Sequence, residues 1–131
     1  MDHTVPSKLE LASKKAEREI RPWGELVVLE NAANHRILKI KINPGHRQSL
    51  KMHHHRRESF VVLRGVLKLT LENREALLHV GEIASINPCN TYRLENPGVI
   101  PLEIVETITG EYLEPDDVIR FADDYARTSN S

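Results

Sequence analysis

The sequence predicts an all-β domain, built as a sandwich or a barrel. Short segments in which apolar and polar residues alternate make up most of the chain, and Arg36–Ile42 is the clearest of them. Turn-forming pairs such as Pro44-Gly45 and Pro97-Gly98 separate these segments. Strands at intervals of roughly 8–12 residues with frequent turn signals are typical of sandwiches and barrels, in which each strand buries one face.

The bulk composition is that of one globular domain. The chain has 131 residues, enough to bury a core without disulfides, and its single cysteine, Cys89, cannot form an internal disulfide. The formal net charge of −1 provides no overall attraction for nucleic acid or an anionic membrane. The N-terminal region lacks the apolar segment of a signal peptide or membrane span. We therefore expect a cytoplasmic protein without nucleic-acid or membrane partners.

The first residues predict an arm or a short helix. Apolar residues within Leu9–Ile20 recur near helical spacing, and Ser7 with Glu10 matches a capping box. The segment Arg21–Gly24, which contains proline and glycine, ends this helix. The chain is accordingly divided into an N-terminal arm or helix at residues 1–20 and a β domain at residues 21–131.

The β segments then follow in order, and alternation or apolar runs mark each of them. Asn31–Asn34 is the turn between the first two, because asparagine tolerates positive φ. The expected strands are Leu26–Leu29, Arg36–Ile42, Ser59–Leu63, Gly65–Leu71, Ala76–Val80, Ile83–Ile86, Thr91–Leu94 and Pro101–Thr109.

The C-terminal segment departs from the β pattern. Pro115–Arg127 opens with Asp116 and Asp117, which are followed by several apolar residues. Acidic residues are favourable at the positive end of a helix dipole. The segment therefore predicts a short C-terminal helix.

The most unusual feature is a polar segment between two apolar ones. His53-His54-His55 is followed by two arginines and by Glu58. So many imidazoles side by side in a small domain indicate a pocket or a binding site rather than scaffold. The spacing around this segment resembles the two motifs of the cupin family. The positions of the first motif hold Gly45, Lys51, His53, Glu58 and Gly65, and those of the second hold Gly81, Pro88, Tyr92 and Asn96.

Within the cupins, the blocks are similar to those of the type II mannose-6-phosphate isomerases, whose domain ends the bifunctional isomerase/mannose-1-phosphate guanylyltransferases. The resemblance implies a double-stranded β-helix, a jelly-roll-like barrel, and a homodimer. It also implies a sugar phosphate substrate and aldose–ketose isomerisation through an enediol. The similar blocks are Arg21–Gly24, Met52–Arg56, Arg93–Gly98, Gly110–Leu113 and Asp116–Arg120.

The resemblance also implies a divalent metal such as zinc, held by Gln, His, Glu and His at the positions of Lys51, His53, Glu58 and Tyr92. A protonated lysine cannot ligate a metal, and zinc sites use three or four protein ligands. We therefore expect a remodelled, metal-free pocket in which Lys51 pairs with Glu58. If a metal binds, its expected ligands are His53, Glu58 and His55, because His55 is two residues further along the same strand face. His54 is expected to point away.

The candidate catalytic residues are Lys51, His53, Glu58 and Tyr92. Isomerisation needs a base for the C2 proton and a group that polarises the carbonyl. Glu58 or His53 is the candidate base. Lys51 takes the electrostatic role of the metal, and Tyr92 shuttles a proton between oxygens.

Two arginines are candidates for the substrate phosphate, because guanidinium groups match phosphate oxygens. Arg56 lies beside the histidines, with solvent exposure at a turn as the alternative. Arg120 matches a family arginine near the sugar phosphate, with a salt bridge to a nearby aspartate as the alternative.

Two other functions stay open. The first is a catalytically inactive domain that binds a sugar or regulates a partner. The second is a metal-free epimerase or isomerase of nucleotide-linked sugars, which would use histidine and tyrosine as acid and base.

Overall fold

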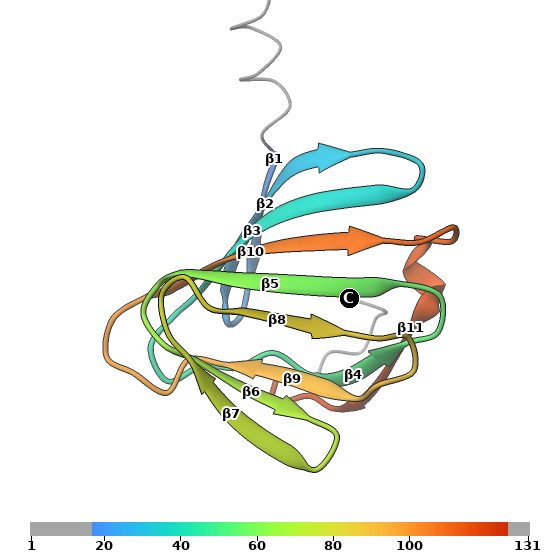
Figure 1. The fold of residues 1–131 in the computed structure, drawn as a ribbon. Coiled ribbons are helices and arrows are strands. Elements are labelled where there is room, and N and C mark those ends of the chain that lie inside the picture. The colour runs from blue at the N-terminus through green and yellow to red at the C-terminus, as the bar shows by residue number, and fades with distance from the viewer. Residues whose placement is uncertain (1–16, 126–131) are drawn as a thin grey trace, which may run out of the picture.

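The computed structural model describes residues 17–125, in which eleven strands form two antiparallel sheets that face each other (Figure 1). This confirms the all-β prediction. The strands are β1 (Glu17–Arg21), β2 (Gly24–Asn31), β3 (His35–Ile42), β4 (Leu50–His53), β5 (Arg57–Arg64), β6 (Leu67–Leu71), β7 (Arg74–Leu78), β8 (Ile83–Ile86), β9 (Tyr92–Glu95), β10 (Leu102–Thr109) and β11 (Val118–Ala122).

The strand order interleaves distant parts of the chain. The six-stranded sheet has the order β1-β2-β3-β10-β5-β8, and the five-stranded sheet has the order β11-β4-β9-β6-β7. Strand β10 therefore lies between β3 and β5, with Ile104 opposite Ile40 on one side and Val62 on the other. The eight expected strands are all present, Ile83–Ile86 with the same ends and the others with shifted ends, and β4 is an additional short strand that ends at the first residue of the histidine run.

The helix predicted near the N-terminus is wrong for Glu17–Ile20. These residues belong to β1, which pairs with β2 from Glu17 opposite Val28 to Arg21 opposite Gly24. Without β1, the edge of β2 would leave a row of backbone groups without strand partners. Pairing along this edge overrides the weak helical pattern. The proposed cap at Ser7 and Glu10 lies outside the described residues.

The predicted C-terminal helix is also wrong. Pro115–Asp117 form one 3-10 turn, and Val118–Ala122 continue as β11, which pairs with β4. The Asp117 carboxylate does not cap a helix. It accepts the backbone N–H groups of His54 at 3.1 Å and His55 at 3.0 Å. Asp117 comes directly before β11, and His54 and His55 come directly after β4. These hydrogen bonds therefore hold the start of β11 beside the end of β4.

The core lies between the sheets. Alternate residues of β10 are buried, as the period of two requires, and their partners on the facing sheet come mainly from β6 and β9. Trp23 and Tyr92 belong both to this core and to the wall of a polar cavity. The fully apolar part of the core includes Ile40, Ile42, Phe60, Val62, Leu67, Leu94, Leu102 and Ile104.

Asn96 orders the connection from β9 to β10. Its buried amide nitrogen donates to the carbonyl oxygens of Ile42 at 2.9 Å and Ile100 at 2.8 Å. Its side-chain oxygen accepts the backbone N–H of Gly98 at 2.9 Å. One buried side chain thus satisfies three backbone groups of the loop and of β3.

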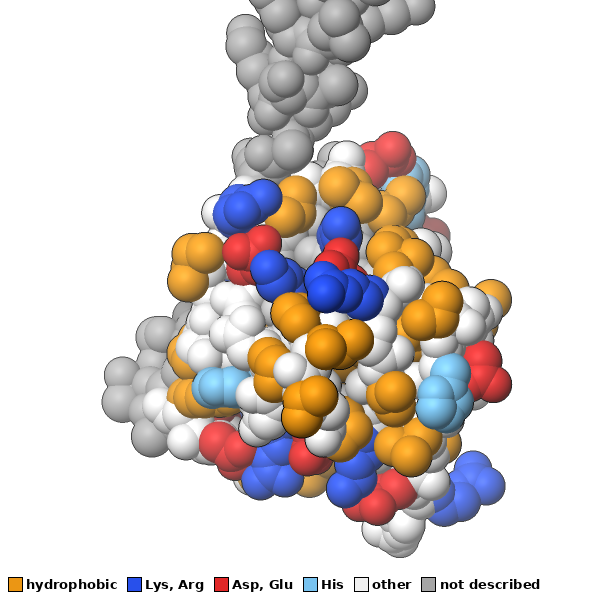
Figure 2. All heavy atoms as spheres, turned by 90° about the vertical axis from the view of Figure 1, so that its left-hand side faces the viewer, with side chains coloured by type: hydrophobic (Ala, Val, Ile, Leu, Met, Phe, Trp, Pro, Cys, Tyr) orange, Lys and Arg blue, Asp and Glu red, His pale blue; other side chains and the backbone are white. Residues whose placement is uncertain are grey.

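The surface carries several exposed apolar side chains, among them Ile83 on β8 and Val99 in the loop before β10. Figure 2 shows one face on which apolar and charged side chains are interspersed. Across residues 17–125, no helix has the length and apolar character needed to cross a bilayer. The homodimer stays a prediction.

Gly110 fixes the contact between the end of β10 and the turn after β4. A methyl group added there would lie 2.5 Å from the carbonyl oxygen of His55 and 3.2 Å from Cα of Arg56. The first distance is too short for any side chain, so the backbone would have to move. Because Arg56 belongs to this turn, the close approach also sets where its side chain enters the cavity.

We predict that Gly110→Ala lowers the free energy of unfolding by about 1–3 kcal/mol, as overpacking at a rigid contact does. Gly98→Ala is the matched control, because its added methyl meets its nearest neighbour, Asn96 Oδ1, at an ordinary 3.5 Å. Urea unfolding measures both, and the control should stay within about 0.5 kcal/mol of the wild type. Equal stability of the two variants would contradict the prediction.

Candidate functional site

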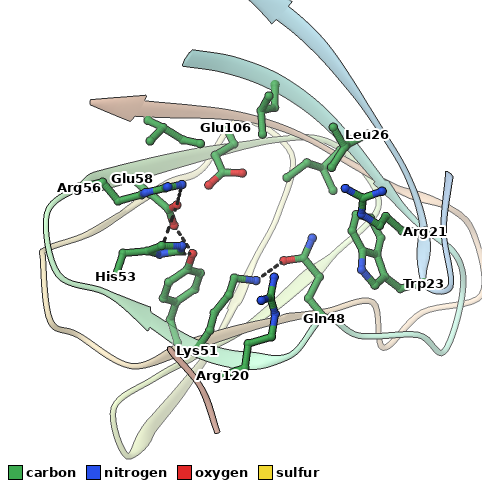
Figure 3. A pocket seen from close by; sticks show the side chains of 14 residues that line it. Arg21, Trp23, Leu26, Gln48, Lys51, His53, Arg56, Glu58, Glu106 and Arg120 are labelled. Atoms are coloured by element: carbon green, nitrogen blue, oxygen red, sulfur yellow. Dashed lines mark hydrogen bonds and ion pairs between the residues drawn. The ribbon is translucent and has the colours of Figure 1, made fainter. Parts of the chain in front are cut away.

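A polar cavity of about 160 Å³ lies between the two sheets (Figure 3). It brings together six residues that the sequence singled out, and they come from β4, β5, β9, β11 and the turn after β4. These residues are Lys51, His53, Arg56, Glu58, Tyr92 and Arg120.

Strand alternation and register explain the arrangement. Lys51 and His53 are two residues apart on β4, so both side chains face the cavity as predicted. Tyr92 on β9 is the register partner of Lys51. Glu58 approaches from β5, in the other sheet. The cavity is therefore lined by side chains from both sheets.

Tyr92, Glu58 and His53 form a buried cluster. The Tyr92 hydroxyl donates a short hydrogen bond to Glu58 Oε1 and lies 3.4 Å from His53 Nδ1. The same imidazole nitrogen is 3.6 Å from Glu58 Oε2. The Glu58 side chain is only 3 % exposed, so these contacts replace water around its carboxylate.

Burial governs the protonation of this cluster. It lowers the pKa of His53 to about 3, assisted by the charges of Arg56 and Lys51. The imidazole is therefore neutral at neutral pH. Burial also raises the pKa of Tyr92 well above its usual value, and the negative charge of Glu58 adds to this effect. The phenol accordingly keeps its proton and can donate it.

Lys51 lies beside this cluster. Its ammonium donates to Gln48 Oε1 at 2.8 Å and lies 5.2 Å from the centre of the Tyr92 ring, within the range of a cation–π contact. The ion pair between Lys51 and Glu58 that the sequence analysis expects stays a prediction. The hydrogen bond described for the Lys51 ammonium goes to Gln48 instead. Sequence reasoning did not single out Gln48.

Arg56 is buried, so the alternative of a solvent-exposed turn residue is wrong for this arginine. Its Nη1 lies 3.8 Å from Glu58 Oε2, and its Nε lies 3.8 Å from Asp117 Oδ2. Within the described residues, Nε has no hydrogen-bond partner. Two carboxylates thus already balance the charge of this guanidinium.

The other two histidines lie outside the cavity. Strand β4 ends at His53, and the chain turns, so the expectation that His55 shares the face of His53 is wrong. The His55 side chain is 60 % exposed and its Nδ1 lies 2.6 Å from Asp117 Oδ1. His54 is exposed, as predicted. Burial opposes ionisation of Asp117, but the hydrogen bonds from His55 and His54 outweigh it and lower the pKa of Asp117.

Glu106 is a cavity residue that sequence reasoning missed. It is 6 % exposed and lies diagonally across from Glu58, because Phe60 and Ile108 are the respective register partners of these two glutamates. Burial, then the charge of Glu58 and a hydrogen bond with it, raise the pKa of Glu106 well above its usual value. The sequence did carry a signal, since Glu106 occupies an inward position in phase with apolar residues of its strand.

These side chains do not fit a divalent metal. Across the part of the chain that the structure describes, no three His, Cys, Asp or Glu side chains are placed to hold one. Lys51 brings an ammonium, which has no lone pair, into the lining of the cavity. Tyr92 uses its hydroxyl to donate to Glu58. Of the four positions at which the resemblance implies a ligand, His53 and Glu58 keep a residue that can bind a metal. Two protein ligands are fewer than the three or four of zinc sites.

Residues 10–123 match the family model described as "Mannose-6-phosphate isomerase C-terminal". The chain belongs to this family. A mannose-1-phosphate guanylyltransferase of Escherichia coli K12 is 42 % identical over 114 residues, which is 86 % of this chain and 24 % of that protein. The chain thus spans about a quarter of the length of this relative.

Solved structures confirm the fold predicted from the cupin resemblance. A double-stranded β-helix protein from Klebsiella pneumoniae superposes with a TM-score of 0.70 at 16 % identity, covering 86 % of this chain and 95 % of that one. An RmlC-like cupin from Shewanella frigidimarina superposes with a TM-score of 0.66 at 15 % identity, covering 74 % and 86 %. The chain therefore has the double-stranded β-helix fold of the cupins.

We predict that Glu106→Gln changes how stability depends on pH. A glutamate with a raised pKa in the folded state stabilises the fold fully below its ordinary pKa. This contribution is lost as the pH rises towards the raised value, because the unfolded chain ionises first. The wild type should therefore lose stability relative to Glu106→Gln with rising pH, by at most about 1.4 kcal/mol per pH unit.

Glu103→Gln is the matched control for this prediction, because Glu103 lies on the same strand with its side chain on the outer face, 3.2 Å from Lys39. Denaturant unfolding at several pH values measures the free energy of unfolding of all three proteins. Parallel curves for the wild type and Glu106→Gln would show that Glu106 ionises alike in both states, against the prediction.

Proposed function

We propose that the cavity isomerises an aldose phosphate of the mannose 6-phosphate type to the ketose phosphate, through an enediol and without a metal. One observation carries the proposal: a buried carboxylate, Glu58, lies beside a tyrosine that holds its proton, and a lysine ammonium lies 5.2 Å from the ring of that tyrosine. Base, proton donor and positive charge are the groups that enediol chemistry requires. Membership of the mannose-6-phosphate isomerase C-terminal family supports the substrate class.

Glu58 is the better of the two candidate bases. A neutral imidazole whose pKa is lowered to about 3, as in His53, is a weak proton acceptor at neutral pH. In the proposed reaction, the Glu58 carboxylate takes the proton from C2 and returns it to C1. His53 lies 3.4 Å from the Tyr92 hydroxyl and positions it.

The remaining groups act on the oxygens. As C2 loses its proton, negative charge develops on the carbonyl oxygen, and the Lys51 ammonium stabilises it in place of a divalent ion. Tyr92 gives its proton to this oxygen and regains one from the neighbouring hydroxyl, which completes the shift of the carbonyl. An ammonium is a weaker electrophile than a divalent metal, so a low turnover is expected.

The proposal predicts that the wild type exchanges the C2 proton of mannose 6-phosphate in deuterated buffer, which proton NMR detects even without net conversion. Glu58→Gln removes the base and should reduce the exchange rate by at least about 100-fold. Glu103→Gln changes a carboxylate on the outer face and should exchange like the wild type.

Other outcomes of this experiment contradict the proposal in distinct ways. Binding of mannose 6-phosphate by calorimetry without exchange would identify a sugar-binding or regulatory domain. Exchange at a nucleotide-linked sugar, with none at mannose 6-phosphate, would favour an epimerase or isomerase of such sugars.

The metal-free part of the proposal predicts that protein purified without chelator or added metal holds substoichiometric zinc, manganese, iron and nickel by elemental analysis. The double variant Lys51→Gln, Tyr92→His carries the donor set that the family resemblance implies and should gain a bound metal. Stoichiometric metal in the wild type that is lost on His53→Ala would overturn this part.

A further inference from the structure

The cavity has a buried end and a more exposed rim. Glu58 and Glu106 lie at its buried end, and the side chains of Arg21 and Arg120 reach it from the more exposed rim (Figure 3). A ligand with a negative charge at one end and hydroxyl groups at the other therefore has a preferred direction. Arg56 also lines the cavity, and its surroundings differ from those of Arg21 in ways that bear on anion binding.

Arg56 is a poor choice for a phosphate. Its guanidinium is buried between the carboxylates of Glu58 and Asp117, each 3.8 Å away. A phosphate placed there would face these two carboxylates. Like charges at such short range in a buried site repel strongly. The position of Arg56 suits it to balance the charge of Glu58, so the phosphate needs another partner.

Arg21 also pairs with a carboxylate, that of Glu19, but it differs from Arg56 in its exposure and in its place in the cavity. In Figure 3 it lies on the opposite side of the cavity from Glu58, next to Trp23. Its side chain is 32 % exposed, so a phosphate can reach it without complete loss of water. Glu19 holds one of its terminal nitrogens, and the backbone carbonyl of Ile20 accepts from the other. A guanidinium has five N–H donors, so several stay available to an anion.

The backbone holds Arg21 in place. It is the register partner of Gly24 in the turn between β1 and β2. Gly24 has φ of +156°, and a methyl group there would lie 1.9 Å from the carbonyl oxygen of Lys41. This turn therefore packs directly on β3, which fixes the start of the Arg21 side chain relative to the cavity. A donor that is already positioned loses less entropy when it binds a ligand.

We propose that Arg21 is an anion-binding residue of the cavity, which holds the phosphate of an open-chain sugar phosphate at the rim while the reacting carbons lie beside Glu58. This assignment rests on the proposed function for the identity of the sugar. It adds a residue from the N-terminal hairpin to the site and replaces Arg56 in the phosphate role.

Calorimetry with mannose 6-phosphate, mannose and inorganic phosphate tests the assignment. Arg21→Gln should bind mannose 6-phosphate about 10- to 100-fold more weakly than the wild type, the loss typical of a hydrogen bond to a charged group. Its affinity for mannose should not change. Arg21→Lys keeps the charge but not the fork of donors and should fall between the two.

Arg18→Gln is the matched control, because Arg18 lies on the same strand, is 64 % exposed, is not among the cavity residues and pairs with Glu25 at 3.6 Å. It should bind all three ligands like the wild type. Circular dichroism confirms that each variant folds. Equal affinities of Arg21→Gln and Arg18→Gln for mannose 6-phosphate would overturn the assignment, as would a loss of mannose binding equal to that of its phosphate.

The two proposals fail separately. If the wild type binds inorganic phosphate but not mannose 6-phosphate, and Arg21→Gln abolishes the binding, the anion site stands and the proposed substrate falls. If mannose 6-phosphate binds through Arg21 but the C2 proton does not exchange, the proposed catalysis falls. Absence of binding by both phosphate compounds in the wild type would overturn the anion site itself.

Discussion

The arrangement of the cavity depends on the buried carboxylate of Asp117. It accepts the backbone N–H groups of His54 and His55, contacts the His55 ring, and lies near Arg56. These contacts join the start of β11 to the turn between β4 and β5. Because that turn carries Arg56 into the cavity, one side chain links the C-terminal segment to the charge balance around Glu58. Hydrogen bonds to a buried carboxylate are strong, since the alternative is an unsatisfied charge.

The charges in the cavity form a connected set. The Glu58 carboxylate lies near Tyr92, His53 and Arg56, and burial keeps Tyr92 protonated and His53 neutral. A neutral imidazole and a protonated phenol leave the carboxylate as the natural proton acceptor. The ammonium of Lys51 supplies positive charge within reach of the Tyr92 ring. The family resemblance implies metal ligands at the positions of Lys51 and Tyr92, which here hold an ammonium and a phenol.

Strands were predictable where alternation was strong. Arg36–Ile42 follows the period of two closely and was recovered with one residue of difference at its start. The N-terminal and C-terminal strands were read as helices, because Glu17–Arg21 and Val118–Ala122 show little alternation. What decides their conformation is the edge of β2 or β4 with which each pairs. Glu106 was missed because β10 carries polar residues on both faces, and the sequence alone does not show that Glu106 faces the cavity.

The sequence by itself determined the cupin fold, the position of the pocket and the identity of Lys51, His53, Glu58 and Tyr92 as its residues, because motif spacing is a property of the chain. Only the tertiary structure decided that His55 leaves the strand face of His53, that Arg56 is buried, and that Glu106 and Arg21 share the cavity with Glu58. These facts depend on where a strand ends and which strands become neighbours, and local residue patterns do not encode contacts between segments far apart in the chain.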